Sequence, residues 1–592
     1  MPNIRILKAA GVALLALGAV LPMGLAGQQH DQHQEPDPHA GHDMEMDHDM
    51  HMDHEMEMDG GWLMPPMDPN MPMLPGLETA VPPVSAWLPH FDLNPEDFPV
   101  AEPSQAVRLA EGDTLDLLVS PVRRTIQGQE YLMFGYNNQY PGPFIQAERG
   151  STVVVRVRNE IQFPTTVHWH GIRLDFRFDG VPGLTQAPIE PQEEFIYEIA
   201  VPDAGMFWYH PHVREDIQQD LGLYGNLMVL PDEANDGGAF HREELLTLDD
   251  LLMTEGGQLI PYGLESPVHA LMGRYGTVML VNGVTDHHLE VDRGEVVRFH
   301  LTNVANARPF NVRFGEMDVK LVASDIGPFE RESWVGSVPI SPAERYAVDV
   351  RFPESGTVAI TNTIQAVDHF RGVFYPHVDT LAVVTVRDQE VATDLSHRFD
   401  ALHTNDQVVQ DIATFRDHFD REPDHEISTR VRIRDLPQAI VLSMEADTFY
   451  VPPVEWNDAM PMMNWLSSGT QVTWILEDQE TGGRNEEIHW TFQQGDVVKI
   501  RVFNEPQDFH PMQHPIHIHG QRFLVVARDG IEQDNLVWKD TAMIPVGSTM
   551  DLLVEMSNPG DWMIHCHIAE HLSAGMHFHF TVEPADAPAD SP

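Results

Sequence analysis

The chain's single cysteine lies between two histidines, in the stretch HCHIAEHLSAGM that begins at His565. A thiolate and imidazoles together are ligands for copper and zinc. If HCH belongs to a strand, successive side chains point to opposite faces, so His565 and His567 face one side and Cys566 faces the other. This spacing predicts two metal sites joined through the backbone of one residue.

Three further pairs of histidines have the same one-residue spacing: His168 and His170 in HWHG, His210 and His212 in HPH, and His517 and His519 in HIHG. A lone histidine is usually a packed or solvated residue, whereas four such pairs indicate ligands. His514 opens HPIHIHG, and His571 and Met576 follow Cys566. Two imidazoles, a thiolate and a weak thioether form the blue-copper set. Zinc accepts imidazole and thiolate too, but a structural zinc site does not account for eight further paired histidines.

The histidine pairs belong to a pattern that the chain repeats three times. RGSTVVVRVRNE, RGEVVRFHLTNV and QGDVVKIRVFNE each run from a glycine to an asparagine at one spacing, and PDAGMFWYHPH, PESGTVAITNT and SNPGDWMIHCH follow them in turn. Their apolar and β-branched residues, bounded by turn residues, predict strands. We therefore expect an all-β protein of three consecutive β-sandwich domains.

The middle copy of the pattern lacks the histidines. Val312 and Phe314 occupy the positions of the first pair, and Thr361-Asn362-Thr363 occupies the position of the second. The strands can therefore form without the histidines, which indicates that the histidines serve function.

Charge and composition restrict the partners. The chain has 91 acidic and 35 basic residues, for a net charge of −56, which repels nucleic acid and anionic membranes and attracts cations. Arg5, Lys8 and the apolar run from Ala9 to Val20 are typical of an export signal, and this run is too short to span a membrane. We expect an exported protein, periplasmic or extracellular, without stable membrane insertion.

These features divide the chain into seven segments. We expect an export signal over 1–27, a Met/His/Asp-rich arm and linker over 28–100, domains over 101–235, 236–390 and 435–584, a linker over 391–434 and a disordered tail over 585–592.

In that order, HWHG, HPH, HPIHIHG and HCHIAEHLSAGM resemble the four copper signatures of the multicopper oxidases, the family that contains laccases and copper-efflux oxidases. The resemblance implies three cupredoxin-like Greek-key domains and four coppers per chain. Type 1 (blue) copper would be bound by His514, Cys566, His571 and Met576. Type 2 copper would be bound by His168 and His517, and the type 3 pair by His170, His210, His212, His519, His565 and His567.

The resemblance also implies a reaction. Four one-electron oxidations at the blue copper would pass electrons through Cys566 to the other three coppers, where O2 is reduced to water. Asp179 in DGVPGLTQ and Glu570 in HIAEH are candidate catalytic acids that supply protons; the alternatives are a turn-forming aspartate and a solvated loop glutamate. An axial Met576 predicts a modest potential, suited to easily oxidised substrates.

The reducing substrate stays open between two classes. The first expectation is phenols and aromatic amines, which would make the protein laccase-like, and the alternative is cuprous ion, which would make it a metal-ion oxidase for copper tolerance. The arm HDQHQEPDPHAGHDMEMDHDMHMDHEMEMDGG has ligands for extra copper ions, although an acidic spacer fits its composition too, and MPMMN (Met460, Met462, Met463) offers more thioethers. A copper nitrite reductase has fewer histidines, and a copper carrier does not explain the four pairs.

Overall fold

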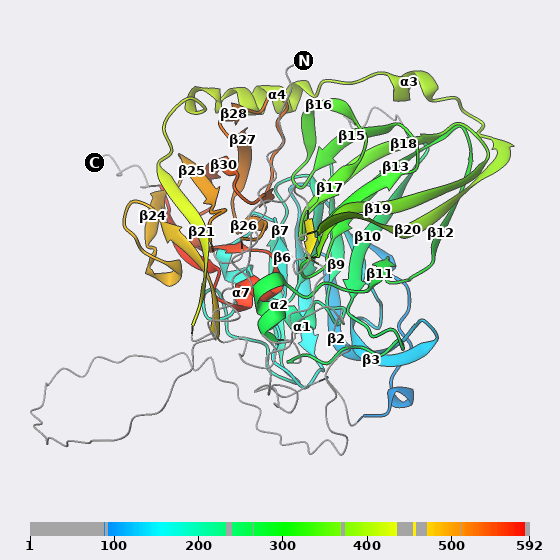
Figure 1. Cartoon of the computed structure of the whole chain (residues 1–592), viewed down its shortest axis with the longest axis horizontal. Helices are drawn as coiled ribbons and strands as arrows, with labels where there is room; N and C mark the ends of the chain where they lie inside the picture. The colour runs from blue at the N-terminus through cyan, green and yellow to red at the C-terminus, as the bar shows by residue number, and fades with distance from the viewer. Residues whose placement is uncertain are drawn as a thin grey trace, which may run out of the picture. The chain divides into compact units, whose positions relative to one another are not determined.

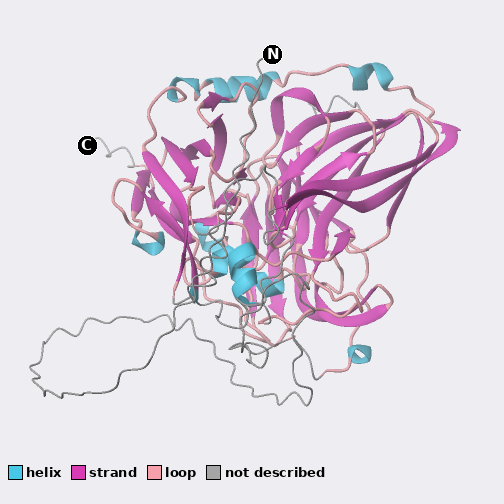
Figure 2. Ribbon diagram, in the orientation of Figure 1, coloured by secondary structure: helices cyan, strands magenta, loops and turns pink. Residues whose placement is uncertain are grey.

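The computed structural model describes Leu88 and residues 93–231, 240–263, 266–368, 373–434, 454–456, 471–508 and 511–585. These residues belong to one compact unit, Met64–Pro592. Strands dominate and the helices are short (Figure 2), and the described strands form six sheets, two for each predicted domain. The prediction of an all-β chain of three sandwich domains is confirmed. The predicted export signal, almost all of the arm and the MPMMN stretch lie outside the described residues.

The first domain is built from strands β1 to β9 (Figure 1). One sheet has the order β3-β2-β5-β7: β3 (Gln129–Tyr136), β2 (Thr114–Ile126), β5 (Thr152–Asn159) and β7 (Glu194–Ala200). The other has the order β1-β4-β9-β8-β6: β1 (Ala106–Leu109), β4 (Phe144–Glu148), β9 (Gly225–Leu230), β8 (Gly205–His210) and β6 (His168–His170). Three short helical segments connect them or precede them: η1 (Pro95–Asp97), η2 (Phe176–Phe178) and α1 (Glu215–Gln218).

The second domain repeats this plan with longer strands. One sheet is β11 (Val278–Val281), β10 (Arg242–Leu251), β13 (Glu295–Asn303), β18 (Arg345–Phe352), β15 (Val319–Ser324) and β16 (Pro328–Val335). The other is β12 (His287–Arg293), β20 (Val373–Glu390), β19 (Gly356–Asp368), β14 (Phe310–Phe314) and β17 (Val338–Ile340), with β22 (Val454–Trp456) paired to β19. Helix α2 (Ser266–Met272) lies between β10 and β11 in the chain.

The third domain carries the last sheet pair. One sheet is β23 (Val472–Asp478), β21 (His425–Ile433), β25 (Asp496–Asn504), β30 (Thr549–Met556), β27 (Arg522–Arg528) and β28 (Ile531–Glu532). The other is β24 (Trp490–Gln493), β32 (His577–Glu583), β31 (Gly560–Cys566), β26 (His514–Ile518) and β29 (Thr541–Ile544). Its short helical segments are η5 (Asn485–Glu487) and α7 (Ala569–Ser573).

The structure differs from the sequence prediction at the end of the linker over 391–434. This segment forms α3 (Ser396–Asp400), α4 (Asp406–Ala413) and η3 (Arg416–His418), and it ends in β21. Because β21 pairs with both β23 and β25, it is a strand of the third domain, which therefore begins before residue 435. Arginines and a glutamate on its less buried positions obscure its alternation in the sequence.

The repeated glycine-to-asparagine pattern forms the corresponding strands β5, β13 and β25. The three asparagines, Asn159, Asn303 and Asn504, are buried, and each side-chain amide donates to two carbonyls beyond the strand. In the third copy the acceptors are the carbonyls of Met512 and Ile544. Each asparagine thus ties the end of its strand to the segment that leads to the next strand, β6, β14 or β26.

The buried apolar side chains form three clusters, one centred on each domain. The cluster of the third domain includes Cys566 and Met576, together with Val268, Leu271 and Met272 of α2. Helix α2 therefore belongs to the second domain by sequence and to the core of the third domain by packing. It lies beside α7 (Figure 1).

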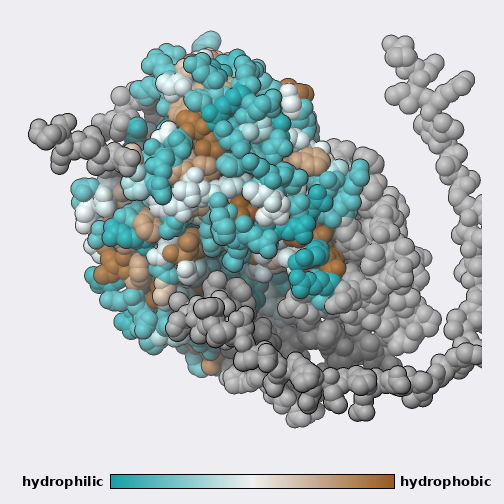
Figure 3. Space-filling view, turned by 90° about the vertical axis from the view of Figure 1, so that its left-hand side faces the viewer, coloured by the Kyte–Doolittle hydropathy of each residue, from teal (hydrophilic) through white to brown (hydrophobic). Residues whose placement is uncertain are grey.

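The surface reflects the acidic composition. On the face drawn in Figure 3, hydrophilic residues predominate and apolar residues form scattered patches. Among the residues that the structure describes, no helix has the length and apolar character needed to cross a bilayer.

Candidate metal centres

The histidine pairs lie on strands that are hydrogen-bonded neighbours or at the ends of these strands, with His212, His519 and His567 just beyond β8, β26 and β31. In the first domain β6 pairs with β8, so that His168 lies opposite His210. In the third domain β26 pairs with β31, and His517 lies opposite His565. In the middle domain Val312 of β14 lies opposite Asn362 of β19. The same strand pairing thus exists in all three domains, and two of them carry imidazoles on it.

Cys566 and its two histidine neighbours point to different centres, as the alternation of a strand requires. The Cys566 sulfur lies 3.5 Å from His514 Nδ1 and 3.7 Å from His571 Nδ1. His565 instead meets a histidine just beyond the end of the neighbouring strand β26, with 3.0 Å between its Nε2 and His519 Nε2. We call His514, Cys566 and His571 the cysteine centre.

The cysteine centre is closed off from solvent. Its three ligand-type side chains are fully buried, and the Nδ1 atoms of His514 and His571 are 3.3 Å apart. Trp474 packs on both imidazoles, with ring centroids 4.9 Å and 4.2 Å away. Met576, the predicted axial ligand, is buried in the same core cluster, and its carbonyl accepts a hydrogen bond from the Cys566 amide.

Eight further histidines form a second group, which we call the histidine cluster: His168, His170, His210, His212, His517, His519, His565 and His567. Their ligand atoms fall into three sets that could each hold an ion: His168, His170 and His517; His170, His210 and His567; and His212, His519 and His565. Each set combines residues of the first and third domains. The cluster therefore exists only because these two domains meet.

The chemistry of these nitrogens fits metal binding. Five cluster histidines each have one buried ring nitrogen without a hydrogen-bond partner, and His567 has two: His168 Nε2, His170 Nδ1, His210 Nε2, His212 Nε2, His517 Nε2, and His567 Nδ1 and Nε2. Burial and mutual repulsion hold the pKa values of six of the eight cluster histidines well below the ordinary range, and burial lowers that of His567 to about 3. Buried polar atoms without a partner are costly, so neutral imidazoles whose lone pairs converge here fit cationic metals.

The cysteine centre shows the same electrostatics. Burial lowers the pKa of His514 to about 3 and that of His571 well below its ordinary value. Burial also raises the pKa of the Cys566 thiol. The thiol must lose its proton to bind a metal, so an ion here replaces a proton on sulfur and binds more tightly as pH rises.

Two aspartates orient the histidine cluster in matching ways. Asp179, on the loop after β6, accepts from His519 Nδ1 through its carboxylate (2.8 Å) and from His168 Nδ1 through its backbone carbonyl (2.7 Å). Asp540, just before β29, accepts from His170 Nε2 (3.0 Å) and through its carbonyl from His517 Nδ1 (2.8 Å). Each aspartate therefore fixes one imidazole of its own domain and one of the other. Such partners set which ring nitrogen faces a metal.

Asp540 was not among the site residues predicted from the sequence. It lies in VWKDTAM, which contains no histidine and no acidic pair. Its contact with His170 of HWHG is hidden because the two residues lie 370 positions apart, and the meeting of the two domains creates it. Only its place before a strand rich in apolar residues could have drawn notice.

Glu570 lies on α7 with most of its side chain buried. Its Oε1 accepts from the Asn306 amide at 3.2 Å, and its Oε2 has no hydrogen-bond partner. Burial, aided by the nearby Asp216, raises its pKa to about 8.

A second buried acid, Glu215 of α1, was not predicted from the sequence, in contrast to Glu570. Its Oε2 lies 3.9 Å from His212 Nε2, and burial raises its pKa well above the ordinary value.

Sequence comparison identifies the family. Two family models described as multicopper oxidase match the chain, one over 119–234 and the other over 455–586. These two regions carry the histidine pairs. The chain belongs to the multicopper oxidase family. It is an oxidoreductase, and copper is the cofactor that its histidine groups fit, with four ions per chain typical of the family. The family's reaction uses O2 and a reducing substrate.

Individual relatives span most of the chain. Multicopper oxidase MmcO of Mycobacterium tuberculosis is 26% identical over 80% of this chain and 88% of its own length. Laccase-1 of Cryptococcus neoformans is 26% identical over 78% of each chain. The structure of a Campylobacter jejuni multicopper oxidase, described as a metallo-oxidase, superposes with a TM-score of 0.63 at 22% identity and covers 85% of this chain and 98% of that one. This last likeness shows the fold.

Proposed function

We propose that the enzyme takes single electrons from a reducing substrate at the cysteine centre and uses them at the histidine cluster to reduce O2 to water. When bound, copper supplies the one-electron chemistry at both centres. The observation that carries the proposal is the position of Cys566, whose sulfur belongs to one centre while the imidazoles on either side of it belong to the other.

The chain itself provides the path between the centres. A few covalent bonds lead from the Cys566 sulfur through its backbone to His565 and His567. A hydrogen bond shortens one branch, since the His565 Nδ1–H donates to the Cys566 carbonyl at 2.9 Å. Because all three residues are buried, the path is rigid and closed to water.

Glu570 is placed to hold a proton beside this path. Its raised pKa of about 8 leaves much of it protonated at neutral pH, and its unpartnered Oε2 is free to donate. Reduction of O2 to water consumes protons, so a carboxyl group poised near neutral pH suits that demand. We assign Glu570 the role of proton donor on this basis.

Helix α2 covers His571, and we call it the cover. It favours a small reductant. The outer nitrogen of His571, Nε2, faces the Leu271 carbonyl of α2 at 3.2 Å, and Leu271 and Met272 are buried against the third domain. A phenol ring therefore has no direct contact with His571 while α2 stays in place. Cuprous ion needs no such contact surface, and the acidic protein attracts cations. We propose cuprous ion as the preferred substrate.

Oxidation of phenols and aromatic amines is the second candidate. The relative named laccase-1 favours it, and electrons can reach His571 across α2 from a phenol bound outside. The two functions are compatible in one enzyme, but α2 should make the phenol reaction the slower one.

We further propose that the protein is exported to a periplasm or the extracellular space, and that its Met/His-rich arm collects copper ions. Both rest on sequence composition. The N-terminal sequence of the protein recovered from each cell fraction tests the export, and copper titration of the full chain against a chain without residues 28–63 tests the arm.

Oxygen uptake by the copper-loaded enzyme tests the substrate assignment. Rates with cuprous ion, corrected for its uncatalysed oxidation, are compared with rates for a simple methoxyphenol. The variant Leu271→Ala removes an apolar side chain from the cover, and Leu289→Ala, a buried leucine of the second domain, is its matched control.

We expect cuprous ion to be preferred by the parent enzyme, and we expect Leu271→Ala to raise kcat/KM for the phenol while Leu289→Ala does not. A parent enzyme that prefers the phenol, together with an unchanged phenol rate in Leu271→Ala, contradicts the assignment of cuprous ion. Absence of oxygen uptake with every reductant contradicts the oxidase proposal itself.

A further inference from the structure

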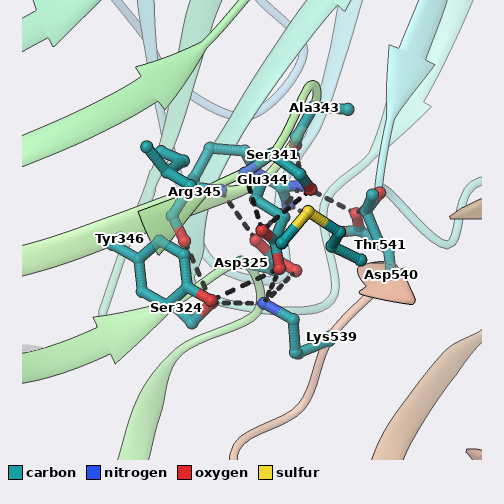
Figure 4. A network of polar contacts seen from close by, with 12 residues as sticks. Ser324, Asp325, Ser341, Ala343, Glu344, Arg345, Tyr346, Lys539, Asp540 and Thr541 are labelled. Carbon is teal, nitrogen blue, oxygen red and sulfur yellow. Dashed lines mark hydrogen bonds and ion pairs between the residues drawn. The ribbon is translucent and has the colours of Figure 1, made fainter. Parts of the chain in front are cut away.

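A buried network of charges lies where the three domains meet. Five buried charged side chains take part: Asp325, Glu344, Arg345, Lys539 and Asp540 (Figure 4). The first three come from the middle domain and the last two from the third. Burying charges is costly unless they are paired and hydrogen-bonded, so a network of this size at a domain junction calls for a functional explanation.

Arg345, the first residue of β18, contacts all three domains. Its two terminal nitrogens donate to the two carboxylate oxygens of Asp540, at 2.7 Å and 2.5 Å. Its Nε donates to the Met206 carbonyl of β8 in the first domain at 2.8 Å. Within its own domain it donates to the Ala343 carbonyl at 3.0 Å, and its amide donates to Asp325 at 2.8 Å. Every contact is fully buried.

Asp540 connects Arg345 to the histidine cluster, because it contacts both. Its carboxylate fixes His170 through Nε2 and leaves His170 Nδ1 without a partner. Its carbonyl fixes His517 through Nδ1 and leaves His517 Nε2 without a partner. His170 and His517 belong together to one of the three sets that could hold an ion. Thr541 Oγ1 contacts the same two held nitrogens at 3.0 Å and 3.1 Å, so a shift of the segment with Asp540 and Thr541 would turn two imidazoles at once.

The glycine of HWHG leaves room for this contact. A Cβ on Gly171 would lie 2.3 Å from Asp540 Oδ2 and 2.9 Å from Arg345 Nη2. The backbone of the first domain therefore packs directly on the paired side chains. The motif glycine serves a contact with the other two domains as well as the turn, where its φ is +84°.

We propose that Arg345 is a positioning residue through which the middle domain, which lacks the histidine pairs, sets the geometry of the copper cluster between the other two. It holds the Asp540 carboxylate in the orientation that accepts from His170 Nε2 and leaves His170 Nδ1 to metal, and it anchors the segment whose Asp540 carbonyl accepts from His517 Nδ1. This inference rests on the copper assignment of the histidine cluster and is independent of the reducing substrate.

We expect that lysine at position 345 cannot hold the orientation of the Asp540 carboxylate as Arg345 does. A guanidinium pairs with both carboxylate oxygens and fixes the carboxylate plane, whereas an ammonium is a point charge with no planar fork. Arg345→Lys keeps the buried charge and removes the orientation, so it separates positioning from charge balance. Arg298→Lys is the matched control, because Arg298 makes the same double contact with Asp349 inside the middle domain, at 2.7 Å and 3.0 Å.

The experiment measures copper site by site in the full chain. Total copper per chain, the blue thiolate absorption and the paramagnetic signal of type 2 copper are recorded for the parent, Arg345→Lys and Arg298→Lys during titration against a copper chelator. We expect Arg345→Lys to weaken copper binding at the histidine cluster about 10- to 100-fold, as loss of a partner that orients a ligand does. The blue absorption should persist, and Arg298→Lys should match the parent.

Cluster copper that titrates in Arg345→Lys as in the parent overturns the proposal. Equal losses in both lysine variants also overturn it, because a purely structural role predicts that result. If Arg345→Lys does not fold, the double variant Arg345→Gln/Asp540→Asn removes one charge of each sign and leaves the net charge of the network unchanged. The same selective loss of cluster copper is expected there, and retention of normal cluster copper refutes the inference.

Discussion

Asp179 offers a direct test of two roles that a carboxylate can play beside the histidine cluster. The sequence presents it as a candidate proton donor, whereas the structure places its carboxylate on the ring of His519 and its carbonyl on that of His168. Asp179→Asn keeps an oxygen that accepts from His519 and removes the acid. Asp179→Ala removes both the acid and the acceptor.

The expected size of the effect follows from these contacts. Asp179→Ala deletes the bond to His519 but leaves the carbonyl bond to His168, so one of the two histidines loses its partner. Loss of such a partner lowers metal affinity about 10- to 100-fold, which is about 1.4 to 2.7 kcal/mol. If orientation is the role of Asp179, Asp179→Asn should keep both copper and turnover, and Asp179→Ala should lose cluster copper.

Chelator titration and oxygen uptake, measured on the same samples, decide between the roles. The blue absorption serves as an internal control, because Asp179 contacts the histidine cluster and Cys566 reports the other centre. Slow turnover by a fully copper-loaded Asp179→Asn enzyme would refute orientation as the main role and support proton donation. Unchanged copper affinity in Asp179→Ala would refute the orienting role.

Three further outcomes are expected. Glu570→Gln should slow oxygen reduction and leave the blue absorption intact, and unchanged turnover would remove Glu570 from the mechanism. Met576→Leu should raise the potential of the blue copper in a redox titration, since a thioether ligand is lost; a fall or no change would show that Met576 is not axial. Asp220, whose pKa burial raises from 3.8 to about 6, favours the folded state when protonated. The parent should therefore lose stability relative to Asp220→Asn, by about 3 kcal/mol in all, as pH rises from below 3.8 to above 6 in chemical unfolding of the copper-free protein.

The strands and their faces could be predicted from the sequence because their signals are local. Alternating apolar residues, bounding glycines and a pattern repeated three times predict the three sandwiches and the opposite directions of Cys566 and its neighbours. The charged strand β21 escaped prediction, because its arginines and glutamate hide its buried face. Helix α2 escaped too, since nothing in its sequence says that it packs on a different domain.

The candidate ligands were readable for a similar reason. His-x-His spacing is a property of one strand, and its absence from the middle copy at Val312 and Phe314 is visible by comparing the copies. In contrast, Asp540, Glu215 and Arg345 lie in stretches that have no spacing signal. The roles of Asp540 and Arg345 arise from contacts across domains, which no periodicity within a strand encodes.

The sequence by itself therefore determined the repeated pattern of strands and the types of ligand. It also determined that Cys566 faces one side of its strand while His565 and His567 face the other. Only the tertiary structure decided which histidines share an ion-sized space, which ring nitrogens face it, and that a domain without histidine pairs reaches the cluster through Arg345. The physical reason is that a ligand's identity is fixed by its residue type, whereas its orientation is fixed by hydrogen bonds to Asp179 and Asp540, and those donated by His519 and His170 form only when the domains pack together.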